Sequence, residues 1–259
     1  TDTDTVGTYG CTLGGADAAD FACSISGSTV NIAFAADPNY ESPADADTNN
    51  VYIVTVLIDD GAADDANGAT TLTITVADVN DITPTYTATS TTPTVNEGAT
   101  AVDSNVAITD ADTGDSNTCN LGGADAGSFT CTLTGQTAYT LAFSSAPDYE
   151  NPGSAGSSNE YTVTVSINDG SNDGATITYT VTVADTNDQT PVYQAADADD
   201  AITVNENVGT GSIDAGTITD ADTVGSYGCT LGGADAADFA CTISGSTVNV
   251  AFAADPNYE

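Results

Sequence analysis

Short acidic phrases recur along this sequence in a fixed order, and they are its best candidates for chemistry. In the middle of the chain they read Asn96-Glu97, Asp110-Ala111-Asp112, Asp148-Tyr149-Glu150, Asn168-Asp169-Gly170 and Asp185-Thr186-Asn187-Asp188. Their carboxylate and amide oxygens are hard ligands of the kind that Ca²⁺ prefers. The chain carries 38 Asp and Glu but no Lys, Arg or His, so its formal charge of −38 has no internal counterion. We therefore expect bound cations, Ca²⁺ first, to neutralise it.

Other uses of these acids are weaker. Asp112-Thr113-Gly114 matches the triplet of aspartic proteases, but the equivalent phrases at 4–6 and 222–224 have Val in place of Gly. A calcium loop of the EF-hand type starting at Asp110 would need a Glu at its twelfth position, where Leu121 stands. Without His, no Ser–His or Cys–His catalytic pair is possible. We predict that the protein is not an enzyme.

Charge and hydropathy also limit the partners. Nucleic-acid binding depends on Lys and Arg, which are missing, so nucleic acid is not expected as a partner. No apolar run is long enough to cross a bilayer, so membrane insertion is not expected either. A salt-tolerant acidic surface remains an alternative reading of the acids. It fits Asp17, Asp20, Asp64 and Asp65, which lie outside the ordered phrases, but it does not explain the fixed order of the others.

Internal repetition shows which elements position the acidic phrases. The six Cys form three pairs with one common spacing, Cys11 and Cys23, Cys119 and Cys131, and Cys229 and Cys241. The pairs themselves recur at nearly equal intervals, close to the length of one small β-sandwich domain of roughly 100 residues. Residues 1–41 and 219–259 are almost identical, whereas the middle copy is more divergent, so the repeating unit comprises two domains. The even Cys count at one spacing predicts disulfides within each repeat and an oxidising compartment.

Alternation with a period of two predicts the strands. Tyr161, Val163, Val165 and Ile167 alternate with Thr and Ser, and 177–183 alternates in the same way. Further strands are expected near 104–109, 128–133 and 137–143, with a loop after Pro152. We predict an all-β fold of tandem Greek-key, immunoglobulin-like β-sandwich domains arranged end to end. The expected domains are 1–84, lacking its first strand, 85–191, complete, and 192–259, lacking its last strands. A longer covalent chain is the simpler way to complete the outer two, and strands donated by a neighbouring molecule are the alternative.

With these phrases in this order, the whole chain resembles the cadherin family, particularly the cadherin-like repeats of bacterial and archaeal surface proteins. That family has a Glu near the first strand, Asp-x-Asp, a Leu-Asp-Arg-Glu-like phrase, an Asp at a strand end and Asp-x-Asn-Asp-Asn in the linker. Phrases at opposite ends of one sandwich meet only when repeats stack end to end. The resemblance therefore implies calcium sites at the joints between repeats, with about three Ca²⁺ ions, held by oxygen ligands, per joint.

The resemblance assigns metal ligands residue by residue. At the first joint they are Asn39, Glu41, Asp78, Asn80, Asp81, Asp110, Asp112 and Asp169. At the second joint they are Glu97, Asp148, Glu150, Asp185, Asn187, Asp188, Asp220 and Asp222. Two outer half-joints would use Asp2, Asp4 and Asp60 at one end and Glu206, Asn257 and Glu259 at the other. Asn39 and Asn257 depart from the family's Asp, which predicts weaker binding there.

These expectations lead to one main functional hypothesis and one alternative. The first is a calcium-rigidified structural segment of a long extracellular repeat protein, forming a stiff rod, fibre or sheath at the cell surface. The alternative is the stalk of a calcium-dependent adhesin. Expected partners are neighbouring repeats and other copies of the protein in a filament or surface layer. Ile53 and Leu57 replace the outward Thr162 and Ser166 of the middle repeat, which indicates either a lateral contact or a covering loop.

Overall fold

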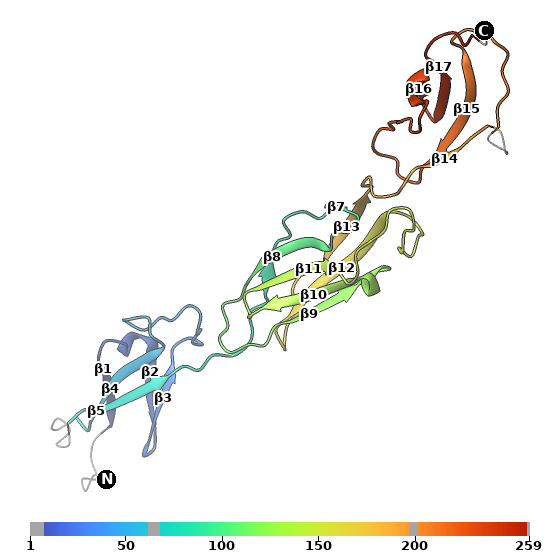
Figure 1. Cartoon of the computed structure of the whole chain (residues 1–259). Coiled ribbons are helices and arrows are strands. Elements are labelled where there is room, and N and C mark those ends of the chain that lie inside the picture. Colours follow the sequence, from blue (N-terminus) through green and yellow to red (C-terminus); the bar gives the residue numbers. More distant parts are fainter. Residues whose placement is uncertain (1–7, 62–67, 197–200, 258–259) are drawn as a thin grey trace.

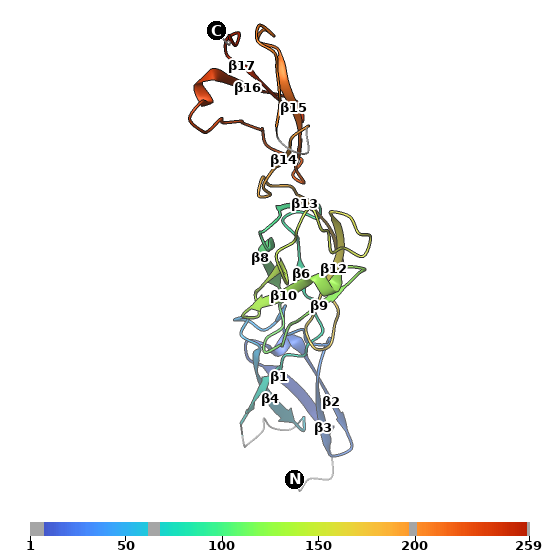
Figure 2. The ribbon, with the colours of Figure 1, turned by 45° about the vertical axis from the view of Figure 1, so that its right-hand side comes forward.

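The structure is a computed structural model that describes residues 8–61, 68–196 and 201–257. Its strands fall into three sets that follow one another along a line, and no sheet is shared between sets (Figure 1; Figure 2). We call them the first, second and third repeats. Short 3₁₀ turns at Ala18–Asp20, Ala126–Ser128 and Ala236–Asp238 are the only helical elements among the described residues. None of the described helices could cross a membrane.

The second repeat is a complete sandwich of two four-stranded sheets. One sheet has the order β10-β11-β8-β6 and the other β7-β13-β12-β9. The strands are β6 (Thr85–Tyr86), β7 (Thr94–Asn96), β8 (Ala101–Thr109), β9 (Thr118–Gly122), β10 (Phe129–Thr134), β11 (Ala138–Phe143), β12 (Glu160–Asn168) and β13 (Ile177–Ala184). The predicted strands and the loop after Pro152 are confirmed, as is the predicted fold class.

Period-two alternation builds the core of this repeat. Tyr161, Val163, Val165 and Ile167 of β12 are buried, while the residues between them are half-buried. Three hydrogen-bonded polar side chains lie within the same core. The Tyr179 hydroxyl donates to Asp103 Oδ2 at 3.0 Å and lies 2.8 Å from the Tyr139 hydroxyl. Burial is the main reason that the pKa of Tyr179 is raised well above its ordinary value.

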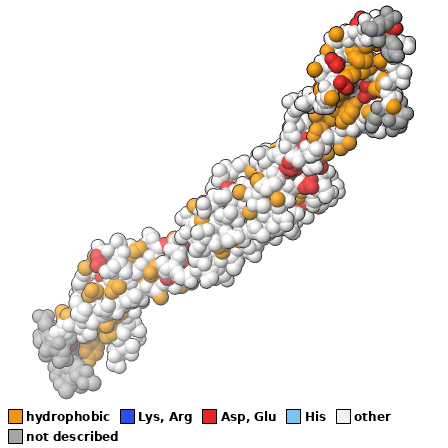
Figure 3. All heavy atoms as spheres, viewed as in Figure 1, with side chains coloured by type: hydrophobic (Ala, Val, Ile, Leu, Met, Phe, Trp, Pro, Cys, Tyr) orange, Lys and Arg blue, Asp and Glu red, His pale blue; other side chains and the backbone are white. Residues whose placement is uncertain are grey.

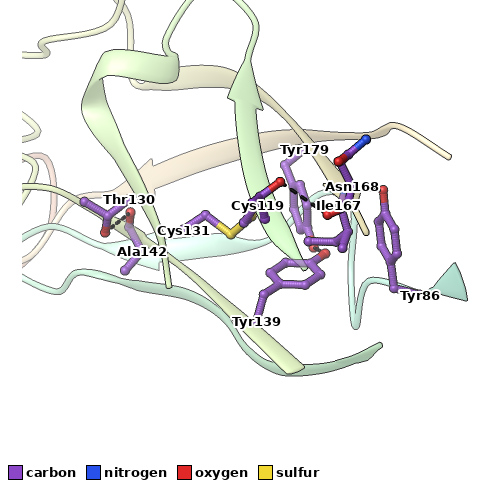
Figure 4. Close-up of a disulfide and its surroundings, with 10 residues drawn as sticks. Tyr86, Cys119, Thr130, Cys131, Tyr139, Ala142, Ile167, Asn168 and Tyr179 are labelled. Carbon is purple, nitrogen blue, oxygen red and sulfur yellow. Dashed lines mark hydrogen bonds between the residues drawn. A yellow bond between two sulfur atoms is a disulfide. The ribbon is translucent and has the colours of Figure 1, made fainter. Parts of the chain in front are cut away.

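The predicted disulfides are confirmed, and each has a clear structural position. Cys119 lies in β9 and Cys131 in β10, so this bond joins the two sheets, close to the tyrosines of the core (Figure 4). Cys11–Cys23 joins the two sheets of the first repeat in the same way, and Cys229–Cys241 is formed in the third. A loop of this length contributes about 3 kcal/mol in the chain-entropy account of disulfide stabilisation.

The first and third repeats each have only part of this architecture among the described residues. The first has the sheet β1-β4-β5 and the pair β2-β3. Its strands are β1 (Gly10–Gly14), β2 (Phe21–Ser26), β3 (Thr29–Phe34), β4 (Val51–Asp59) and β5 (Thr70–Thr75). The third has the single sheet β14-β15-β17-β16, made of β14 (Val192–Gln194), β15 (Ser212–Thr219), β16 (Phe239–Ser244) and β17 (Thr247–Phe252). A hollow in this repeat is lined by apolar side chains such as Leu231 and Ile243 together with polar ones such as Asp220.

One group of acids has a structural role that the sequence analysis missed. Asp17 was expected to be solvated, but it is only 4% exposed. Its carboxylate accepts hydrogen bonds from the backbone N–H of Ala46 at 2.8 Å and of Ile53 at 2.6 Å. In the second repeat Asp125 accepts from Ala155 and Thr162, both at 2.6 Å. In each repeat the carboxylate therefore links the long loop, 35–50 or 144–159, to the start of the strand that follows it, β4 or β12. Asp64 and Asp65 lie outside the described residues.

Candidate metal sites between the repeats

Carboxylates from two repeats converge at the first joint, where residues 76–84 link β5 to β6. Glu41 follows β3 of the first repeat, Asp78 lies in the linker, and Asp112 follows β8 of the second repeat. Each offers a carboxylate oxygen, and these oxygens lie within 4.8 Å of one another. Backbone bonds orient them: the N–H of Ile82 donates to Asp112 Oδ2 at 2.8 Å, and that of Thr113 donates to Asp78 Oδ2 at 2.6 Å. These hydrogen bonds attach the linker to the end of the second repeat that faces the first repeat.

A second cluster lies on the second-repeat side of the same joint. Asp110, Asp112 and Asp115 have carboxylate oxygens within 4.8 Å of one another. The side-chain amide of Asn80 donates to Asp115 Oδ1 at 2.9 Å and to the carbonyl of Asp169 at 3.2 Å. Asp169 itself is buried and accepts from the backbone N–H groups that follow it. Asp112 belongs to both clusters, so adjacent ion sites would share it.

The second joint repeats the arrangement with residues 185–191 as linker. Glu97, Glu150 and Asp185 form one cluster with oxygens within 4.8 Å. Glu150, Asp188 and Asp222 form another by the same measure, and Asp222 belongs to the third repeat. The N–H of Gln189 donates to Asp222 Oδ2 at 2.9 Å, just as Ile82 does to Asp112 at the first joint. Figure 3 shows acidic side chains gathered where the second repeat meets each neighbour.

The chemistry of these clusters fits a cation. Several of their buried oxygens have no hydrogen-bond partner among the described residues: Glu41 Oε1, Asp78 Oδ1, Asp110 Oδ2, Asp112 Oδ1, Asp115 Oδ2, both oxygens of Glu150, Asp185 Oδ1 and Asp222 Oδ1. An unpaired buried carboxylate oxygen is costly, and the sequence has no Lys, Arg or His to pair with it. Oxygen-only ligand sets favour hard divalent cations such as Ca²⁺ over softer metals. The residues therefore fit the group that the resemblance implies.

Hydrogen bonding and burial divide the carboxylates of the second joint into two types. Glu97 accepts from the N–H of Tyr149 at 2.8 Å and of Thr186 at 2.7 Å, and these bonds lower its pKa. Among the described residues, no other residue donates a hydrogen bond to Glu150. Burial raises its pKa, its own backbone N–H opposes this, and the charges of Glu97, Asp185 and Asp222 raise it further. Hydrogen bonding thus favours the ionised form of Glu97, whereas burial and neighbouring charges disfavour the ionised form of Glu150.

Protons should therefore compete with Ca²⁺ for Glu150. Because the pKa of Glu150 is raised in the folded state, its protonated form stabilises the metal-free folded protein at low pH. This contribution to the free energy of unfolding is lost as pH rises through the folded pKa. Ca²⁺ requires the ionised form, so we expect its affinity to fall as pH falls through that window. Calorimetric Ca²⁺ titrations in two buffers of different ionisation enthalpy should detect protons released on binding, and Glu150→Gln should release fewer. Affinity and proton release that do not change with pH would contradict this.

The structure does not bring every expected ligand into a cluster. Asn39 and Asp148 are exposed, and each accepts a backbone bond in its own turn, from Ser42 at 2.8 Å and Asn151 at 2.9 Å. Asp81 and Asn187 are exposed residues of the two linkers. The described acids that also stand outside the clusters are Asp60, Asp169, Glu206 and Asp220. Asn80 contacts the second cluster of the first joint through Asp115, and Asn257 lies after β17 in the third repeat. Asp2, Asp4 and Glu259 lie outside the described part of the chain. Asp115 is the ligand candidate that the repeated phrases could not reveal, because no other repeat has an acid there.

This chain resembles known proteins in structure but not in overall sequence. No protein-family model and no curated protein matches this sequence. The chain is similar to protocadherin gammaB7 domains EC3-6, solved as a cis-dimer, with a TM-score of 0.59 and 23% identity over 98% of this chain. It is similar to PcdhgB3 EC1-4 with a TM-score of 0.61 and 17% identity over 96% of this chain. It spans 60% of the first of those structures and 59% of the second.

A third similar structure is human CDH23 EC21-23. The TM-score is 0.55 and the identity 22%, covering 83% of this chain and 74% of that one. All three are cadherin extracellular domains, and the matches extend over consecutive domains of each. At these identities the likeness concerns the fold. The chain therefore folds as a series of cadherin-like β-sandwich domains.

Proposed function

We propose that this chain is a structural segment of a long extracellular repeat protein whose joints are locked by Ca²⁺. One observation carries the proposal. At both joints, buried carboxylate oxygens without hydrogen-bond partners come from both flanking repeats, as Glu41 and Asp112 do at the first and Glu150 and Asp222 at the second. A cation bound there would be held by two domains at once, which would restrict their relative motion.

The proposed function implies particular repeat boundaries and a particular set of metal ligands. The repeats would be 1–84, 85–191 and 192–259, with the sites between them. The clustered carboxylates would be the core ligands, and the remaining family positions, such as Asn80 and Asp169, would complete the shells around about three ions per joint. The origin of the protein in bacteria or archaea remains part of the proposal, resting on resemblance alone.

Location and assembly follow from the same features. Three disulfides fit an oxidising compartment outside the cell. The sites are electrostatic and structural, so we propose no catalytic role. Further copies of the protein would be partners in a rod, fibre or sheath. Ile53 is 47% exposed on the sheet of the first repeat and Leu57 is half-buried, so Ile53 is the residue that a lateral contact there would use.

Calcium removal tests this function directly. Extracellular calcium modules bind with Kd of about 10⁻⁴–10⁻³ M, so the chain should be rigid in a few-fold excess of Ca²⁺ over that range and flexible in EDTA. Small-angle scattering should show a long, well-defined maximum dimension with Ca²⁺ and a broadened distance distribution with EDTA. The β-sheet circular dichroism signal should persist, because the second repeat has its own core and disulfide.

Mg²⁺ at equal concentration is the control, since it has the same charge but prefers six-fold coordination with retained water. It should stiffen the chain less. An end-to-end length that is the same in Ca²⁺ and EDTA would reject the calcium lock while leaving the cadherin-like fold intact.

A further inference from the structure

The two joints differ at one position that the ordered acidic phrases do not include. Asp115 follows the Asp110-Ala111-Asp112 phrase of the second repeat, whereas the third repeat has Gly225 at the equivalent place. Gly225 has a φ of +112°, and a Cβ there would stand 2.4 Å from the side-chain nitrogen of Asn187. The linker amide therefore occupies that space at the second joint. At the first joint the matching amide of Asn80 donates to Asp115 instead.

Asp115 is placed as a ligand would be. Its Oδ1 accepts from Asn80, while its Oδ2 is buried without a partner among the described residues. Asp110 Oδ2 and Asp112 Oδ1 are also buried and unpartnered, and the three residues form one cluster. Asp112 is only 9% exposed, so this is more than a group of surface acids. Three carboxylate oxygens gathered without donors favour a cation between them.

The loop that carries Asp115 is also held by hydrogen bonds between Asn117 and Gln136 of the same repeat. The side-chain amide of Asn117 donates to the carbonyl of Gln136 at 2.8 Å, and its backbone N–H donates to the Gln136 side chain. The third repeat has Tyr227 in place of Asn117. The second repeat thus has a loop held by Asn117 and carrying an added carboxylate, and the third repeat lacks both of these side chains.

We propose that Asp115 supplies a side-chain oxygen to a Ca²⁺ site at the first joint that has no equivalent at the second. The inference rests on the proposed function, since it assigns one more ligand within a calcium-bound joint. The two joints would then differ in calcium affinity, because the number of charged ligands sets the affinity of such sites.

Matched backbone amides allow each joint to be followed separately. The N–H of Ile82 bonds to Asp112 at the first joint, and that of Gln189 bonds to Asp222 at the second. Ca²⁺ titration of the whole chain, monitored through these two amide resonances, gives a midpoint for each joint. Asp115→Asn keeps an acceptor for Asn80 but removes the charge. We expect it to raise the Ile82 midpoint about tenfold and to leave the Gln189 midpoint unchanged.

Glu160→Gln is the control, because it removes one charge from an exposed side chain of the same repeat and should move neither midpoint. Spectra of Asp115→Asn in EDTA that match the parent chain would exclude misfolding of the loop. The inference is overturned if Asp115→Asn leaves the Ile82 midpoint unchanged, or shifts both amides equally. The proposed function fails in a different way, when neither amide of the parent chain responds to Ca²⁺.

Discussion

Replacement of Glu150 by Gln should raise the Ca²⁺ concentration that rigidifies the second joint by about a hundredfold. Glu150 belongs to both clusters of that joint, and both of its carboxylate oxygens are buried without a partner among the described residues. A single substitution therefore removes charge from two neighbouring ion sites. Gln retains the size of the side chain and one carbonyl oxygen, so the expected loss is one of affinity and not of folding.

The Gln189 amide, which bonds to Asp222 across this joint, should report the change in a Ca²⁺ titration. Glu41→Gln is the matched variant at the first joint, where Glu41 Oε1 is buried and unpartnered. Glu41→Gln should raise the Ca²⁺ midpoint reported by the Ile82 amide and leave the midpoint reported by the Gln189 amide unchanged. Glu150→Gln should have the opposite pattern. The prediction is wrong if Glu150→Gln titrates like the exposed-charge variant Glu160→Gln.

Asp125→Ala should destabilise the second repeat by about 3 kcal/mol, with or without Ca²⁺. The Asp125 carboxylate is 7% exposed and accepts two backbone bonds at 2.6 Å, from Ala155 and Thr162. Removing it leaves two N–H groups without acceptors, each at a cost of about 1–3 kcal/mol. Asp125→Asn should lose about half as much, because its amide offers only one oxygen.

Hydrogen exchange of the buried β12 amides, such as those of Val163 and Val165, measures this stability for the second repeat alone. Asp235→Ala is the control, since Asp235 occupies the same motif in the third repeat but is exposed. Followed through the amides of β17, Asp235→Ala should change the free energy of unfolding of the third repeat by less than about 0.5 kcal/mol. If Asp125→Ala altered calcium affinity and left β12 protection unchanged, Asp125 would belong to the metal sites and not to the fold.

The strands and disulfides could be predicted because their signals are local and repeated. The alternation of Tyr161, Val163, Val165 and Ile167 specifies one buried face of a strand whatever lies around it. The identical spacing within all three Cys pairs indicated the disulfides in the same way. The acidic phrases were also found by repetition, and the structure brings Glu41, Asp78 and Asp112 into one cluster.

The acids that were misjudged, as Asp17 was, or overlooked, as Asp115 was, are those whose position depends on distant partners. Asp17 and Asp115 both occur in polar loops, and the sequence around them looks like solvated surface. Asp17 is buried because the loop that reaches Ala46 folds over it. Asp115 gains its position from Asn80, which belongs to the linker and lies far from it in the sequence. Neither contact leaves a pattern that a single sequence can display.

The sequence by itself determined the repeat, the strand faces of the second repeat and the disulfide pairs, and it led to the expectation of an external cation, because these follow from spacing and composition. Only the tertiary structure decided which acids converge and whether a segment without clear alternation, such as 10–14, becomes a strand. The pentapeptide Gly-Cys-Thr-Leu-Gly is strand β1 at 10–14, paired with β4, yet the identical 228–232 forms no strand. The described part of the third repeat has no strand equivalent to β4. A β-strand exists only through hydrogen bonds to a neighbour, so its formation depends on residues far away in the chain.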